Sequence, residues 1–170
     1  MPLTSYEAAR PWARAIREEV LSRRMPKWHA ARGYGQFAND RSLTPFEIAL
    51  VVAWVDGGAI RGPQQAMQTP PAQEPLPPTR EGYRTRRLSC GERTLPAGRL
   101  LAVKPQLAEG GSAGINVAFP DGRREVIAWI RDYEGKFAET YWLRTPLDIP
   151  RGARLQVEAQ GQCSVAMIFE

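Results

Sequence analysis

Hydrophobic and polar positions follow two different periods along the chain, and the change falls near residue 70. Before it, apolar side chains recur every three to four residues, the spacing of a helix that buries one face. The positions are Trp12, Ala13, Ile16, Val20 and Leu21, then Ile48, Leu50, Val51, Trp54 and Val55. After it, apolar and polar residues alternate, as they do along a strand. The pattern predicts a helical segment followed by a β-rich segment.

Capping residues predict where the helices begin and end. Thr4–Glu7 and Thr44–Glu47 are T-x-x-E capping boxes, so we expect one helix reaching about Arg23 and a second one ending at Gly57-Gly58. The roughly 20-residue loop between them begins near Met25-Pro26 and is long for a compact unit. Such a loop is expected to be functional or to wrap around something.

Proline organises the rest of the chain. The stretch from residue 62 to 78 contains six prolines, which is typical of an extended linker. Three P-x-G turns then recur, which predicts about seven short antiparallel strands; the turns are Pro96–Gly98, Pro120–Gly122 and Pro150–Gly152. The expected fold is α+β in two domains, a small all-α segment and an antiparallel β-sandwich that is jelly-roll-like. Their ranges are 1–61, 62–80 for the linker, and 81–170.

Composition and charge exclude several classes of protein. Hydrophobic residues make up 43% and charged residues 24%, as in an ordinary globular protein. The longest apolar run, Ile48–Val55, is far shorter than the ~20 residues of a membrane span, so no span is predicted. The net charge of +5 is spread over both halves, which argues against a nucleic-acid partner. Arg84, Arg86 and Arg87 are interpreted as a solvated strand edge.

Cysteine and histidine usage limits the chemistry further. Cys90 and Cys163 are 73 positions apart, with no CxxC or CxxCH, which excludes a zinc knuckle, a thioredoxin-type pair and a self-contained haem c attachment site. One disulfide and two buried thiols both remain open. His29 is the only histidine, so it cannot assemble a metal site or a catalytic triad by itself. We expect a loop residue that donates one hydrogen bond, and neither a signal peptide nor a catalytic constellation is visible.

The helical segment resembles a group of bacterial c-type cytochrome domains. The resemblance lies in YEAARPWA (6–13), RMPKWHA (24–30), GYGQFANDRSL (33–43) and IALVVAWVDGGA (48–59). It implies that Met25 is the distal sulfur ligand of a haem iron and that the helix carrying Trp54 packs on the haem edge. Trp12, Trp28 and Trp54 are expected in the core, which would include the haem face. Without the resemblance, Met25 would simply cap a helix end.

The same resemblance implies haem c as cofactor, electron transfer to an unknown redox partner, and a periplasmic or otherwise extracytoplasmic home. The family's CxxCH, which bonds the haem, is absent here and is expected just upstream of Met1. The chain is therefore expected to be a fragment of a longer protein.

The β-segment resembles the C-terminal domain of copper type II, ascorbate-dependent monooxygenases, through LAVKPQLA (101–108), FPDG (119–122) and WIRDY (129–133). In that family two histidines of the first run bind copper, and here these positions are Gln106 and Ala108. Copper binding and monooxygenase activity are therefore not expected. An extracytoplasmic location would permit a Cys90–Cys163 disulfide. The competing hypothesis is a cofactor-free module that binds a protein or another ligand.

Overall fold

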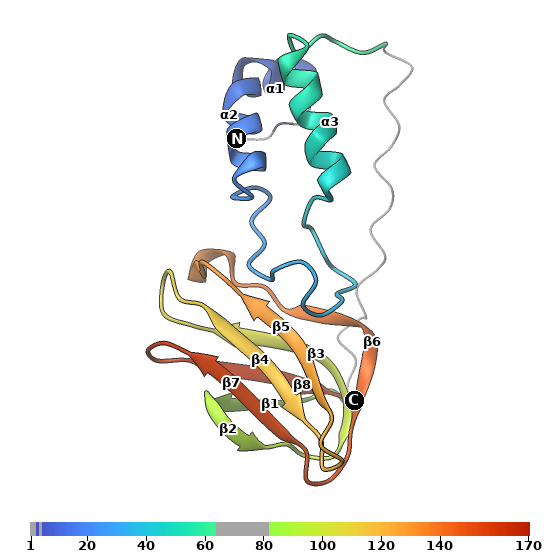
Figure 1. Cartoon of the computed structure of the whole chain (residues 1–170), viewed down its shortest axis with the longest axis vertical. Coiled ribbons are helices and arrows are strands. Elements are labelled where there is room, and N and C mark those ends of the chain that lie inside the picture. The colour runs from blue at the N-terminus through green and yellow to red at the C-terminus, as the bar shows by residue number, and fades with distance from the viewer. Residues whose placement is uncertain (1–2, 4, 64–81) are drawn as a thin grey trace. The chain divides into compact units, whose positions relative to one another are not determined.

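The structure is a computed structural model that describes residues 3, 5–63 and 82–170 (Figure 1). The described residues form two compact units. The first, here the helical unit, contains the described residues up to 28 and those from 41 to 63. The second, the β unit, contains residues 29–40 and 82–170. The predicted linker lies almost wholly outside the described residues.

Short helical segments build the helical unit: α1 (Tyr6–Ala9), the 3-10 turn η1 (Arg10–Trp12), α2 (Ala13–Leu21) and α3 (Pro45–Asp56). The first cap is Ser5, whose Oγ accepts a hydrogen bond from the backbone N–H of Ala8 at 3.2 Å. The predicted partner Thr4 lies outside the described residues. The single predicted helix is interrupted at Pro11, which has no N–H to donate to the preceding turn. No helix in the described ranges is long and apolar enough to cross a membrane.

The second predicted capping box is confirmed at the start of α3. The Thr44 Oγ1 accepts from the Glu47 backbone N–H at 3.1 Å, and the Glu47 carboxylate accepts from the Thr44 N–H at 2.7 Å. Polar contacts then tie α3 to the N-terminal helices. The Tyr6 hydroxyl donates to the Ala59 carbonyl at 3.0 Å, and Arg17 pairs with Asp56 at 2.9 Å.

Eight antiparallel strands build the β unit: β1 (Arg84–Ser89), β2 (Gly91–Thr94), β3 (Gly98–Gln106), β4 (Ala113–Ala118), β5 (Arg124–Ile130), β6 (Tyr141–Ile149), β7 (Arg154–Ala159) and β8 (Ser164–Phe169). They form two four-stranded sheets, β1-β8-β3-β6 and β2-β7-β4-β5. The strand pairs β1·β8, β2·β7, β3·β6 and β4·β5 are nested, as if one long hairpin had been rolled up. The three predicted P-x-G turns connect strands β2 to β3, β4 to β5 and β6 to β7.

Alternation along the strands places the core between the two sheets. Val165, Met167 and Phe169 of β8 are buried. On β4, Ile115 and Val117 are buried while the residues between and beside them face outward. β1 lies at the end of its sheet with exposed arginines, so the predicted solvated edge is confirmed.

Residues 29–40 form a segment that we call the strap. It lies along β5 and β6, one edge strand of each sheet. Ala30 forms an antiparallel bridge to Ile130 of β5, and Phe37 forms one to Leu143 of β6. Backbone N–H groups of Ala31 and Ala38 donate to the carbonyls of Trp129 and Trp142, at 2.7 and 2.8 Å. The predicted helical domain of residues 1–61 therefore needs correction, because its central loop belongs to the β unit.

Candidate functional site

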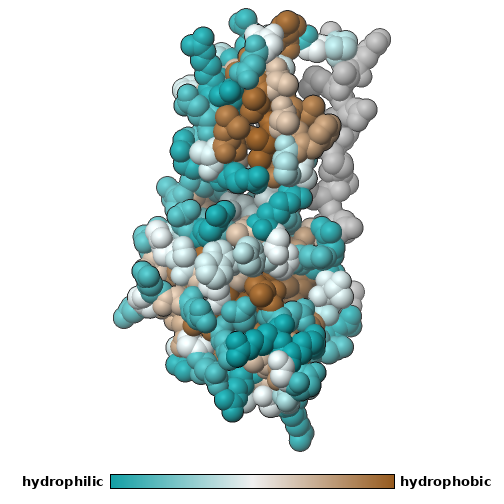
Figure 2. Space-filling view, in the orientation of Figure 1, coloured by the Kyte–Doolittle hydropathy of each residue, from teal (hydrophilic) through white to brown (hydrophobic). Residues whose placement is uncertain are grey.

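The helical unit fully buries few of its apolar side chains. Among its described residues the buried hydrophobic ones are Ala13, Val20 and Ala59, all small. On α3 no residue is buried: Phe46 is 71% exposed and Leu50 53%. Figure 2 shows the resulting apolar surface over the helices. The helices therefore present a hydrophobic face that packing within the described residues does not cover.

The expectation that Trp12 belongs to the core is wrong, because this side chain is 49% exposed. The two other tryptophans are half-buried. Trp54 is fixed at the end of α3, where its Nε1–H donates to the Ile60 carbonyl at 3.0 Å. The short helices of this unit leave all three indole rings at least partly exposed.

Met25 lies just beyond the end of α2. Its backbone N–H donates to the Glu19 carbonyl at 3.2 Å, and the neighbouring Arg24 forms an ion pair with Glu19 at 2.7 Å. The hydrogen bond from Arg24 lowers the pKa of the Glu19 carboxyl. With the chain held in this way, the Met25 side chain remains 45% exposed, so its thioether is accessible to a ligand or a metal. The Met25-Pro26 peptide bond is cis.

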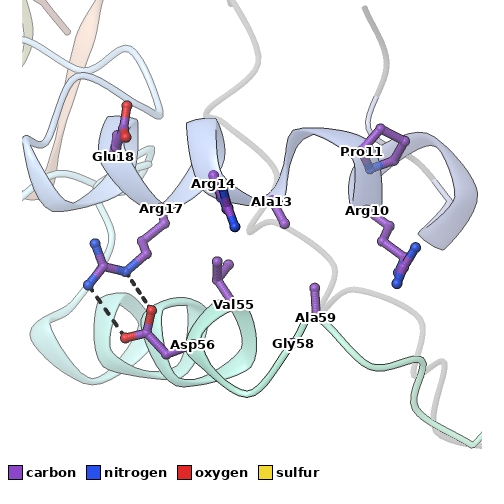
Figure 3. A pocket seen from close by; sticks show the side chains of 10 residues that line it. All are labelled: Arg10, Pro11, Ala13, Arg14, Arg17, Glu18, Val55, Asp56, Gly58 and Ala59. Carbon is purple, nitrogen blue, oxygen red and sulfur yellow. Dashed lines mark hydrogen bonds and ion pairs between the residues drawn. The ribbon is translucent and has the colours of Figure 1, made fainter.

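An open cleft of about 620 Å³ lies between the first helices and the end of α3 (Figure 3). Arg10, Arg14 and Arg17 line it at helical spacing, together with Glu18 and Asp56. Arg17 is neutralised by Asp56 across the cleft, while Arg10 and Arg14 leave it positively charged near the Pro11 turn. Arg10, Arg14 and Arg17 recur at helical spacing in the sequence, and this is the signal that could have indicated the cleft.

Glu7, Glu19 and Asp56 of the helical unit are paired with cations. Glu7 lies 2.9 Å from Arg61, whose guanidinium is also 5.6 Å from the Tyr6 ring centroid. A hydrogen bond from its own backbone N–H and the charge of Arg61 lower the pKa of Glu7. These contacts join the start of α1 to the chain that follows α3.

His29 belongs to the strap and is buried. Its Nε2 accepts a hydrogen bond from the Glu134 backbone N–H at 3.2 Å, so this nitrogen is unprotonated. That the His29 side chain also donates one hydrogen bond stays a prediction. The ring lies 5.5 Å from that of Tyr133. Burial raises the pKa of both Tyr133 and Tyr141, which are beside the strap. The imidazole is therefore committed to the β unit.

The two cysteines are joined in a disulfide with a Cα–Cα distance of 5.6 Å, at the end of the β1·β8 pair. Of the alternatives that the sequence leaves open, the structure has the disulfide. Gln106 ends β3, and its amide oxygen accepts from Arg87 at 3.0 Å. Within residues 5–63 and 82–170, no three His, Cys, Asp or Glu side chains form a group that could hold a metal ion.

Comparison with family models, with curated proteins and with solved structures gives no match to this chain.

Proposed function

We propose that this chain carries the distal part of a small c-type cytochrome domain followed by a β-sandwich of jelly-roll type that lacks copper ligands. In this proposal the parent protein transfers electrons outside the cytoplasm, and the β unit docks or scaffolds. The nested strand pairing supports the sandwich. The observation that carries the cytochrome proposal is the uncovered apolar face of the helical unit.

The described residues fit one side of a haem site. The Met25 thioether is accessible, and the apolar surface of α3 with Trp54 suits the face of a flat macrocycle. The other side does not come from these residues, because the only histidine is buried in the β unit with Nε2 occupied. The proposal therefore requires the CxxCH and its histidine to precede Met1. Haem bound in this way supplies a one-electron iron couple.

The energetics of the helical unit support a missing component. Three small buried residues cannot offset the conformational entropy of ordering several dozen residues. A cofactor bonded to the chain and packed on α3 would bury Phe46 and Leu50 and would supply the missing core.

The test is to produce the chain together with the residues encoded upstream, in a bacterial host with an active haem c maturation system. A covalently bound haem with a Soret band and the optical band of Met–Fe(III) ligation is expected. Met25→Ala should abolish that band and lower the reduction potential within the ~0.8 V range that axial ligands span. Leu21→Ala, which removes another exposed apolar side chain, is the matched control and should leave both unchanged.

Two results would contradict the proposal: the absence of a CxxCH within about 20 residues upstream together with no Soret band, or an unchanged Met–Fe(III) band in Met25→Ala. The first result would favour the alternative of a cofactor-free binding module. In that case the exposed face of α3 would be covered by another protein.

A further inference from the structure

The outer face of the sheet β2-β7-β4-β5 carries hydrogen-bonding side chains and one exposed tryptophan. The register places Trp129, Gly114 and Glu158 in one row across β5, β4 and β7. Asn116 and Gln156 are paired in the next row, which Val126 of β5 and Glu92 of β2 extend at its two ends. The residues alternate with buried ones on the same strands, so this row of groups faces away from the core. In Figure 1 strands β4, β5 and β7 lie in the foreground.

Trp129 lies flat on this face because Gly114 has no side chain. A β-carbon at Gly114 would be 2.9 Å from Cζ3 of the indole and 3.8 Å from Nδ2 of Asn116. One face of the ring is therefore against the backbone of β4, and an amide lies beside it. Trp129 is nevertheless 39% exposed.

The strap adds a second ring to the same place. Tyr34 lies between Gly33 and Gly35, both with positive φ, and its ring centroid is 6.0 Å from that of Trp129, at an interplanar angle of 38°. Tyr34 is 47% exposed. The Tyr34 ring is not needed to hold the strap in place, because backbone pairing at Ala30 and Phe37 already does so. We call Tyr34, Trp129, Asn116 and Glu158 the aromatic platform.

We propose that the aromatic platform binds a neutral polysaccharide whose pyranose rings carry equatorial substituents, of the glucan or chitin type. Such rings have an apolar C–H face that stacks on an indole or phenol, and hydroxyls at their rim that need hydrogen-bond partners. The Asn116 amide both donates and accepts, and the Glu158 carboxylate accepts from hydroxyls. Two rings beside an amide and a carboxylate supply both kinds of contact.

Other ligands that stack on aromatic rings fit less well. A nucleic acid would bring phosphates next to Glu158, whereas the arginines of this face, Arg124 and Arg154, lie two rows away and Arg154 is paired with Glu92. A protein partner would favour a continuous apolar patch, whereas the second row consists mainly of amide and carboxylate groups. Glu92 is also held within the sheet, since Arg154 and Gln156 hydrogen-bond to it and lower its pKa.

Binding can be measured with the full chain by titrating cellohexaose and chitohexaose, and the furan-based fructan inulin serves as the ligand control. A saturable change in tryptophan fluorescence, or heat by calorimetry, is expected with at least one of the two pyranose oligomers and not with inulin. Trp129→Ala should weaken binding at least about tenfold, and Trp129→Phe should retain part of it. Trp12→Ala is the matched control, because Trp12 is a similarly exposed indole in the helical unit.

Circular dichroism of each variant shows whether it is folded, so that a loss of binding can be told apart from a loss of structure. If Trp129→Ala does not fold, Tyr34→Ala and Asn116→Ala take its place, and each should weaken binding several-fold without changing the spectrum. The proposal is overturned by the absence of binding of both oligomers up to millimolar concentration, or by equal affinity of folded platform variants and wild type. It is also overturned if Trp12→Ala causes the same loss of affinity, or if the aromatic platform binds a protein and neither oligosaccharide. None of these results depends on haem.

Discussion

Gly35 lies where the strap passes close to the backbone of β5. Its φ is +79°, in the left-handed region, and a β-carbon there would lie 2.1 Å from the Ile127 carbonyl oxygen. Gly33 has a similar φ of +89° but open space around it. A side chain at Gly33 would therefore cost only backbone conformational energy, whereas one at Gly35 would add a steric clash.

Replacing Gly35 with alanine should destabilise the β unit more than the same change at Gly33. Gly33→Ala carries only the left-handed cost of about 1–2 kcal/mol, whereas Gly35→Ala also forces the strap away from β5. We expect a loss of at least about 3 kcal/mol at Gly35. Urea unfolding followed by fluorescence measures both. Equal effects of the two substitutions would mean that the strap does not pack on β5 as described.

Residue types predicted some individual roles and missed others. The T-x-x-E pattern identified the cap at Thr44, because this cap depends on local spacing. The environment of His29 depends on Glu134, more than a hundred residues away, so no local pattern indicated that Nε2 accepts. Tyr34 and Trp129 were not recognised as a pair for the same reason. The available signal was a tryptophan at an outward position of an alternating strand.

At the scale of elements, the strap extends both sheets of the β unit. β5 and β6 end their sheets, and edge strands expose backbone groups that can pair with other chains. The strap occupies part of both edges. Asn39 contributes most at β6, since its Nδ2 donates to the Thr140 carbonyl at 2.8 Å and its Oδ1 accepts from the Trp142 N–H at 3.1 Å.

Asn39→Ala should therefore destabilise the β unit by about 1–3 kcal/mol, because it leaves two half-buried backbone groups without partners. Asn39→Asp keeps the acceptor and loses the donor, so a smaller effect is expected. Thermal unfolding of the full-length variants provides the measurement. Wild-type stability in Asn39→Ala would show that water replaces the amide at no cost and that the strap is not anchored there.

Turn residues allowed the β unit to be predicted from the sequence. No comparable residues predicted the strap. The three P-x-G turns and the alternation around them indicated an antiparallel fold of nearly the right number of strands. The strap pairs through two isolated bridges, which give it neither the period of a strand nor that of a helix. Its glycines and polar residues are typical of an ordinary loop. The sequence therefore predicted that it belongs to the helical domain.

At the scale of the whole molecule, the two units differ in how their stability is obtained. The helical unit has a few small buried residues and depends on surface ion pairs such as Arg17–Asp56. The β unit contains large buried side chains from both sheets, including Leu100, Ile115 and Phe169. It also has a covalent link between its first and last strands. We therefore expect the β unit to unfold last.

Reduction of the Cys90–Cys163 disulfide tests this expectation. The bond closes a loop across a sequence separation of 73 residues, which spans almost all of the β unit, and the chain-entropy model assigns it about 4 kcal/mol. Reductant should lower the urea midpoint of the β-sheet signal and leave the helical signal unchanged. A Cys90→Ala/Cys163→Ala variant should unfold at the reduced midpoint with or without reductant. If wild-type protein instead unfolds at one midpoint under both conditions while its thiols become reactive, the native packing of β1 and β8 alone determines stability there.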